Sequence, residues 1–175
     1  MKQSILEKLQ QLDKETAHLY ELADGLNEDD LHNQAYGWSI IQVYDHLKFA
    51  EQGTIGYMKK KMQAGDGMPN FSFNGRLRFG LTKALLQSSL KWKAPKVIAN
   101  PEKDLTLDEI KAEWAKARKY TRKFIEEYPD ELLNKAVFKH PFAGRLDLSR
   151  AVDSIIYHQR HHMHQIKRIR KEIGR

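Results

Sequence analysis

Cysteine is absent from this sequence of 175 residues, and its absence excludes several kinds of site. The chain can form no disulfide, no thiolate metal site and no cysteine nucleophile. A reducing compartment is the natural setting for such a chain, so we expect a cytoplasmic location. Long hydrophobic runs are also missing. The N-terminal residues lack the apolar block of a signal peptide, and no segment approaches the length that crosses a membrane.

The composition, 41% hydrophobic and 30% charged, is typical of a soluble globular protein. The length predicts a single domain over residues 1–175 with a substantial core. The charge is unevenly spread, because residues 1–58 contain four basic and ten acidic side chains, whereas residues 59–100 contain nine and one. A basic stretch of this kind either binds an anionic surface or is a solvated face, and the sequence leaves both interpretations open.

Hydrophobic spacing predicts four long amphipathic helices. Two capping boxes support their starting points, one formed by Ser39 with Gln42 and one by Thr106 with Glu109. Asp147 or Ser149 is expected to cap the last helix, which runs almost to Gly174. The helices are expected over about residues 3–26, 39–64, 106–128 and 149–173.

The segments between these helices are harder to interpret. Residues 27–38 and 129–146 are rich in turn formers and are expected to be loops. Residues 65–103 contain breakers and form a long crossover, with a short basic helix around 76–90. Strand signals are sparse. The expected fold is therefore all-α, an antiparallel four-helix bundle with a long crossover segment.

Four of the eight histidines lie between His158 and His164. At 100° per residue, His158 and His162 fall within the apolar stripe of the last helix, whereas His161 lies on its flank and His164 on the far side. On the helix over 39–64, His46 lies at the edge of the apolar face. Three such imidazoles from two helices can hold one metal ion and leave a coordination position open. Spacing alone also allows the alternative that they are hydrogen-bonded core residues.

Two motifs resemble those of the DinB family of bacterial metal-binding four-helix bundles. WSIIQVYDHL, Trp38 to Leu47, looks like the family's opening of its second helix, with His46 in the ligand place. HQRHHMHQI, His158 to Ile166, looks like its closing motif, with His158 and His162 on the ligands and Gln165 on the trailing glutamine. The resemblance implies a divalent metal, zinc or nickel, on these three histidines. The long basic segment 59–100 departs from the simplest family pattern, and it makes transfer of a substrate by analogy unsafe.

The resemblance also implies kinship with enzymes that use low-molecular-weight thiols. We therefore expect a metal-dependent S-transferase that joins a small thiol cosubstrate to an electrophile. A metal-dependent hydrolase and a non-enzymatic metal-binding or anion-binding protein remain the alternatives. The expected partner is a small-molecule substrate, with no specific nucleic acid and no membrane, and a homodimer is left open. No catalytic side chain is assigned from the sequence.

Several side chains near the expected site have more than one interpretation. Trp38 and Tyr44 either wall the pocket or pack in the core. The two other histidines of the last helix, His161 and His164, together with Glu51 and Asp153, are candidates to support the metal ligands. Tyr157 points about 100° away from its neighbour His158 and is given no role. The anion-binding alternative depends on basic side chains interleaved with two aromatic ones, namely Arg76, Arg78, Lys83, Lys91, Lys93 and Lys96 with Phe79 and Trp92.

Overall fold

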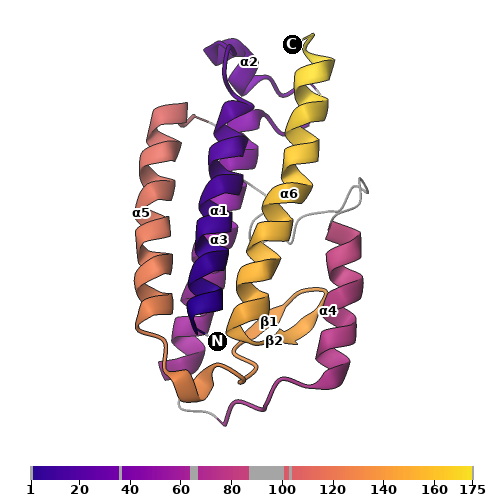
Figure 1. Ribbon diagram of the computed structural model, residues 1–175. Coiled ribbons are helices and arrows are strands. Elements are labelled where there is room, and N and C mark those ends of the chain that lie inside the picture. Colours follow the sequence, from indigo (N-terminus) through magenta and orange to yellow (C-terminus); the bar gives the residue numbers. More distant parts are fainter. Residues whose placement is uncertain (1, 36, 64–66, 87–100, 103, 175) are drawn as a thin grey trace.

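In the computed structural model (Figure 1), the described residues are 2–35, 37–63, 67–86, 101–102 and 104–174. Four long helices pack side by side, with α1 against α6, α6 against α3, α3 against α5 and α5 against α1. The predicted four-helix bundle is thereby confirmed. Its helices are α1 (Lys2–Glu21), α3 (Ile40–Gln63), α5 (Leu107–Glu126) and α6 (Leu148–Glu172).

Local capping explains where the bundle helices begin. Before α3, the Gln42 backbone N–H donates to Ser39 Oγ and the Ser39 N–H donates to Gln42 Oε1. Thr106 and Glu109 form the same reciprocal pair before α5. Asp147 caps α6 by accepting from the Arg150 N–H, which decides between the two expected capping residues. Each cap satisfies donors that the first helical turn leaves without a partner.

The crossover contains helix α4 (Phe73–Leu86), which packs against α6 outside the bundle. In Figure 1 the chain rises through α1, descends through α3, returns upward through α4, descends through α5 and rises through α6. The crossover therefore makes α3 and α5 run in the same direction. Helix α4 begins a few residues before the basic helix expected around 76–90. The rest of that helix, and Lys91, Trp92, Lys93 and Lys96, lie outside the described residues.

Short elements occupy both segments that were expected to be loops. A capping box at Asn27 starts helix α2 (Glu28–His32), and a 3-10 turn covers Asp130–Leu132. Strands β1 (Phe138–His140) and β2 (Gly144–Leu146) then pair as an antiparallel hairpin. Elements of three to five residues are too short to show a period in the sequence, which is why hydrophobic spacing did not predict them.

Two hydrophobic clusters fill the bundle, and polar residues separate them. One cluster includes Leu12, Ile55 and Ile156. The other includes Leu19 and Met163. Between these apolar positions every bundle helix contributes buried or half-buried polar side chains, among them Thr16 of α1, His46 and Glu51 of α3, Arg118 and Thr121 of α5, and His158, Gln159 and His162 of α6. We call this set the polar layer. Among the described residues, no helix is long and apolar enough to cross a membrane.

Candidate metal centre

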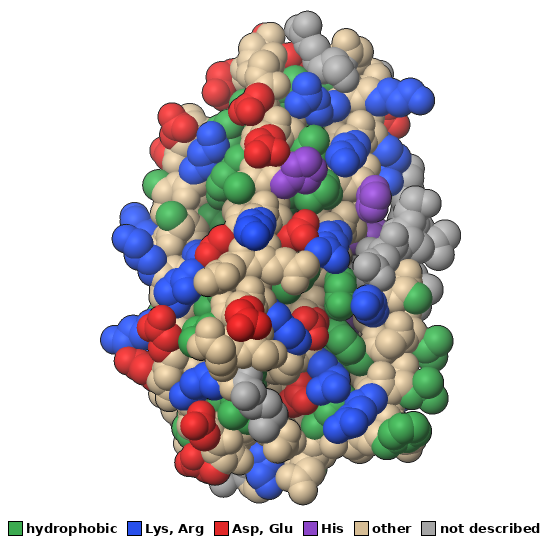
Figure 2. Space-filling model, in the orientation of Figure 1, with side chains coloured by type: hydrophobic (Ala, Val, Ile, Leu, Met, Phe, Trp, Pro, Cys, Tyr) green, Lys and Arg blue, Asp and Glu red, His purple; other side chains and the backbone are tan. Residues whose placement is uncertain are grey.

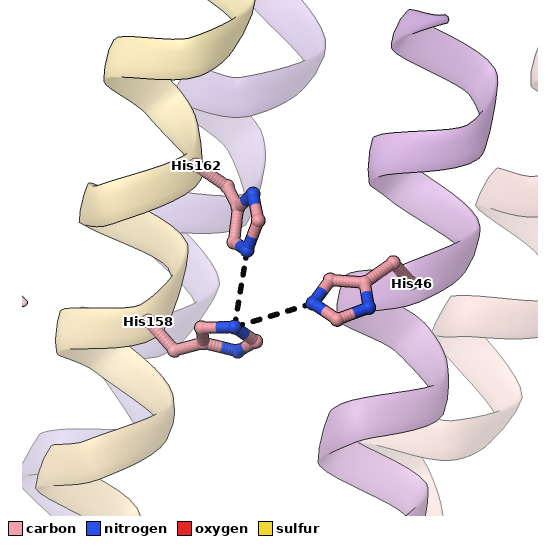
Figure 3. Close-up of side chains that lie close together, drawn as sticks. All are labelled: His46, His158 and His162. Carbon is pink, nitrogen blue, oxygen red and sulfur yellow. Dashed lines mark hydrogen bonds between the residues drawn. The ribbon is translucent and has the colours of Figure 1, made fainter. Parts of the chain in front are cut away.

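Three imidazoles meet within the polar layer, and we call them the histidine cluster. His46 comes from α3, and His158 and His162 come from successive turns of α6 (Figure 3). The Nε2 atom of His158 lies 3.3 Å from Nε2 of His46 and 3.1 Å from Nε2 of His162. One nitrogen from each ring lies within 4.8 Å of the other two. The structure therefore brings together the three residues that the sequence selected.

Gln165 determines which nitrogen of His162 carries the proton. The Nδ1 atom of His162 lies 2.7 Å from Gln165 Oε1, one turn along α6. A carboxamide oxygen only accepts, so Nδ1–H is the donor and Nε2 keeps its lone pair. That lone pair points toward His158. Fixing a ligand's tautomer through its second nitrogen is the usual arrangement around a histidine-bound metal.

Burial keeps His158 and His162 of the histidine cluster uncharged. His46 and His162 are 2% and 8% exposed, and His158 is half-buried. Burial lowers the pKa of His158 well below its usual value, and the neighbouring His162 and His46 lower it further. The pKa of His162 is likewise lowered well below its usual value, first by burial and then by His46. His158 and His162 are therefore neutral at pH 7, which is the form that binds metal ions.

This donor set fits a divalent metal ion. Three neutral nitrogens on two facing helices match the ligand type and number of three-histidine sites, which keep one or more positions open. Imidazole ligands suit zinc, nickel, copper and iron, so the ligand type restricts the metal to this group. The three clustered histidines can hold a metal ion, and the residues that would hold it are His46, His158 and His162.

Of the two aromatic side chains expected near the site, Trp38 lines the histidine cluster and Tyr44 packs in the core. The Trp38 ring centroid lies 4.9 Å from that of His46, so Trp38 covers one side of the cluster. Tyr44 is fully buried, packs against Tyr20 and donates its hydroxyl to the Leu19 carbonyl, which is a packing role.

The other histidines of α6 lie where the helical phase placed them. His164 is exposed, and the ring of half-buried His161 lies beside that of His162 at 5.2 Å between centroids. Tyr157 lies beside the α4 residues Phe79 and Lys83, so it faces the crossover helix. The division of the four histidines predicted from the sequence is thus the one that the structure has.

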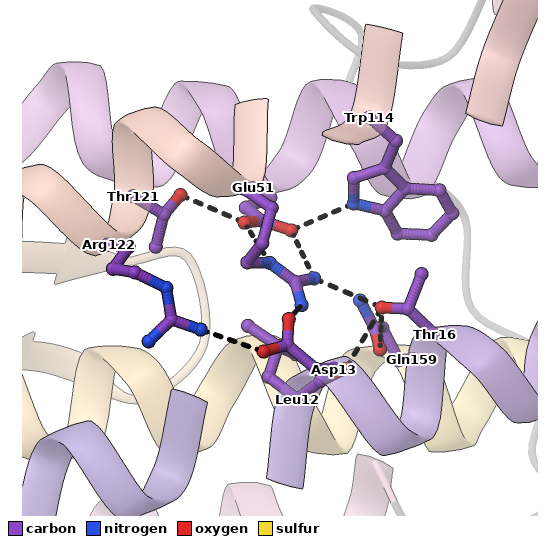
Figure 4. A network of polar contacts seen from close by, with 9 residues as sticks. Leu12, Asp13, Thr16, Glu51, Trp114, Thr121, Arg122 and Gln159 are labelled. Atoms are coloured by element: carbon purple, nitrogen blue, oxygen red, sulfur yellow. Dashed lines mark hydrogen bonds and ion pairs between the residues drawn. The ribbon is translucent and has the colours of Figure 1, made fainter. Parts of the chain in front are cut away.

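Glu51 and Asp153, the two carboxylates considered as supports for the ligands, have other partners. Asp153 accepts from Lys8 of α1 at 2.7 Å. Glu51 is fully buried. Its carboxylate accepts four hydrogen bonds of 2.8–2.9 Å, from Arg118 Nε, Arg118 Nη2, Trp114 Nε1 and Thr121 Oγ1 (Figure 4). We call these four residues the glutamate cluster. The support that the structure does provide is Gln165, which the sequence indicated only as the trailing glutamine of the motif that resembles the family's.

The glutamate cluster continues to α1 and from there to α6. Arg118 also donates to Asp13 through Nη1 and to Thr16 Oγ1 through Nη2, the latter at 3.0 Å. The Thr16 hydroxyl in turn lies 3.2 Å from Oε1 of Gln159, the neighbour of His158 in the chain. The two polar clusters therefore share the polar layer but have separate partners.

The chain matches a known protein family. A family model described as the DinB superfamily matches residues 11–166, which span α1 to α6 and include all three members of the histidine cluster. No curated protein and no solved structure matches the chain.

Proposed function

The chain belongs to the DinB superfamily, and from this premise we propose that it is a metal-dependent enzyme that transfers a small thiol to an electrophile. The observation that carries the proposal is the convergence of the three imidazoles, with the His162 lone pair aimed at its neighbours by Gln165. His46, His158 and His162 hold the metal ion. Zinc and nickel are the metals that we expect there.

Because the three imidazole ligands carry no charge, a metal ion held by them would favour an anionic substrate. Three neutral imidazoles cancel none of the charge of a divalent cation. When bound, the ion would act as a Lewis acid and lower the pKa of a thiol or of water at its open position. The chain contains no cysteine, so a sulfur nucleophile has to come from a separate molecule.

The protein's own residues bind the metal ion, orient its ligands and exclude water from the site. Gln165 accepts the Nδ1 proton of His162 and holds that ring in one orientation. The Trp38 ring covers His46 and limits the access of water from that side. Buried surroundings strengthen any electrostatic interaction between the site and a bound thiol. These features support activation of a nucleophile at the site.

The first experiment measures metal content in protein purified without a histidine tag. We expect about one divalent ion per chain in the wild type, and loss of most of it in His46→Ala, His158→Ala and His162→Ala. His161→Ala and His164→Ala are the matched controls and should retain the ion, because neither belongs to the histidine cluster. Loss of metal in the controls together with retention in His158→Ala would reject this ligand set.

The second experiment measures the reaction. Metal-loaded protein is incubated with a panel of cellular thiols and a chromogenic electrophile, with His158→Ala as the blank. A thiol-dependent rate above that of the blank supports the transferase. If no thiol raises the rate while the loaded protein hydrolyses an ester or amide panel, the function is hydrolysis. Equal rates for wild type and His158→Ala on both panels would leave a non-catalytic metal protein.

A further inference from the structure

Helix α4 has one apolar face that packs against α6 and a second apolar face that is exposed. Phe79 and Thr82 are buried on the side that faces α6. On the opposite side Phe73, Leu77 and Leu81 are 78%, 62% and 62% exposed. These three side chains are four residues apart, so they form one continuous ridge along the helix. Figure 2 shows hydrophobic side chains following one another along the edge that α4 occupies in Figure 1.

This apolar ridge is unusual for a surface helix. Single exposed hydrophobic residues are common, but several large ones aligned on one helix face usually mark a surface that contacts something else. The ridge stands on a helix outside the bundle and is convex. A convex apolar ridge inserts into a soft or grooved partner, and it offers no groove into which a peptide helix could lie.

Basic side chains flank the ridge on both sides. Taking Leu77 as the centre, Arg78 lies about 100° to one side, and Arg76 and Lys83 lie about 100–120° to the other. Helix α4 contains no acidic residue between Phe73 and Leu86. Lys83 lies over the Tyr157 ring, and no salt bridge joins Arg76, Arg78 or Lys83 to an acidic side chain within the described ranges. The ridge is therefore apolar with cationic margins.

The β1–β2 hairpin extends this positive surface beside α4. Strand β2 contacts α4, and an ideal Cβ on Gly144 would lie 3.7 Å from Arg78 Nη1. In the hairpin register Lys139 pairs directly with Arg145, and both side chains are exposed. Like charges at directly opposed positions destabilise a hairpin. An anionic partner would relieve that repulsion.

From these features we infer that the outward face of α4 docks on the surface of an anionic lipid bilayer. Phe73, Leu77 and Leu81 enter the boundary between headgroups and acyl chains, while the flanking cations pair with anionic headgroups. A second copy of this chain fits less well, because a two-fold contact would set three cations against three without an acidic residue from α4. Nucleic acid would satisfy the cations but would leave Leu77 and Leu81 without an apolar partner.

This inference is separate from the proposed reaction, and it differs from the expectation of no membrane partner. That expectation came from the lack of a membrane-spanning run in the sequence, and apolar helices of membrane-spanning length are likewise absent from the described residues. Lying on a bilayer requires neither such a run nor complete burial of the helix. The sequence left open whether the basic segment 59–100 binds an anionic surface. The inference assigns such binding to helix α4 and identifies the surface as a lipid bilayer.

Vesicle flotation tests the inference with full-length protein. Wild type is mixed with phosphatidylcholine vesicles or with vesicles that also contain phosphatidylglycerol. The test variant is Phe73→Ser/Leu77→Ser/Leu81→Ser, and the matched control is Phe49→Ser/Tyr120→Ser, which removes exposed aromatic side chains from α3 and α5. Circular dichroism and thermal unfolding verify that each variant folds like the wild type.

We expect wild type and control to float with the anionic vesicles, and the ridge variant to bind at least about tenfold more weakly, because the inserted apolar area supplies much of the affinity. Binding should also weaken with added salt and be poor on neutral vesicles. Absence of binding to anionic vesicles, or equal binding by the ridge variant, would overturn the inference. So would a wild-type dimer in sedimentation that the ridge variant dissociates, since the occupant would then be a second copy.

Discussion

The two polar clusters of this bundle lie in the same layer and differ in how their atoms are satisfied. In the glutamate cluster, each carboxylate oxygen of Glu51 accepts two hydrogen bonds, all from α5. In the histidine cluster, Nε2 of His158 lies 3.3 Å from Nε2 of His46 and 3.1 Å from Nε2 of His162. A neutral imidazole that donates through Nδ1, as His162 does, has no second proton for these contacts.

The difference separates a cluster that stabilises the fold from a cluster whose nitrogen atoms can accept a metal ion. A fully satisfied buried network holds helices in register and has no capacity left for a ligand. A buried set of lone pairs is costly unless an ion or a proton occupies it. Glu51 and His46 are five residues apart on α3, so position on a helix did not distinguish these roles. The two roles are distinguished by the partners that other helices supply, which come from α5 for Glu51 and from α6 for His46.

The largest expected effect comes from breaking the glutamate cluster. Arg118→Met leaves the Glu51 carboxylate buried without its cation, and we expect the free energy of unfolding to fall by about 3–5 kcal/mol. Denaturant unfolding measures it. Metal binding by the surviving folded fraction should stay close to that of the wild type. The double variant Glu51→Gln/Arg118→Met should recover much of the loss, because no buried charge remains. A single variant as stable as the wild type would contradict this account.

Acid should destabilise the metal-free protein through its histidines. The pKa of His140 is lowered to about 4 by burial, and its Nδ1 accepts from the Phe142 and Ala143 N–H groups of the hairpin turn. Burial also lowers the pKa of His158 and His162. Below about pH 6.5 the unfolded chain binds more protons than the folded one, so stability falls as the pH falls.

We expect His140 alone to contribute about 2 kcal/mol of lost stability between pH 7 and pH 5. Chelator-treated protein is unfolded with denaturant at pH 7, 6 and 5. The His140→Gln and His158→Ala variants should each show a shallower dependence on pH than the wild type, which separates the hairpin contribution from that of the histidine cluster. A free energy of unfolding that is constant from pH 7 to pH 5 would show that these imidazoles are not held neutral.

The smallest expected effect concerns the one side-chain hydrogen bond that orients a candidate ligand. Gln165→Leu removes the acceptor for His162 Nδ1–H, and we expect metal affinity to fall by about 10–100-fold with little change in stability. Gln165→Glu restores an acceptor and should restore most of the affinity. Competition with a chromogenic chelator measures both. Equal affinity for Gln165→Leu and the wild type would mean that packing alone orients His162.

The helices and the candidate ligands could be predicted from the sequence because both depend on local periodicity. The capping boxes at Ser39 and Thr106 are formed within four residues, and the helical phase separated His158 and His162 from His164 without tertiary information. The hairpin and α2 were not predicted, because their few residues give too short a pattern. The sequence left open whether Glu51 supports the ligands, and its actual partner Arg118 could not be predicted because it lies 67 residues further along the chain.

By itself the sequence determined four amphipathic helices, their starting points and which histidines face inward, because each of these follows from neighbours within one or two helical turns. Tertiary structure alone decided that His46 meets His158 across 112 residues, that Arg118 satisfies Glu51, and that one apolar face of α4 stays outside the core. The physical reason is that burial and pairing depend on what packs opposite a side chain. No local pattern specifies which helix that will be.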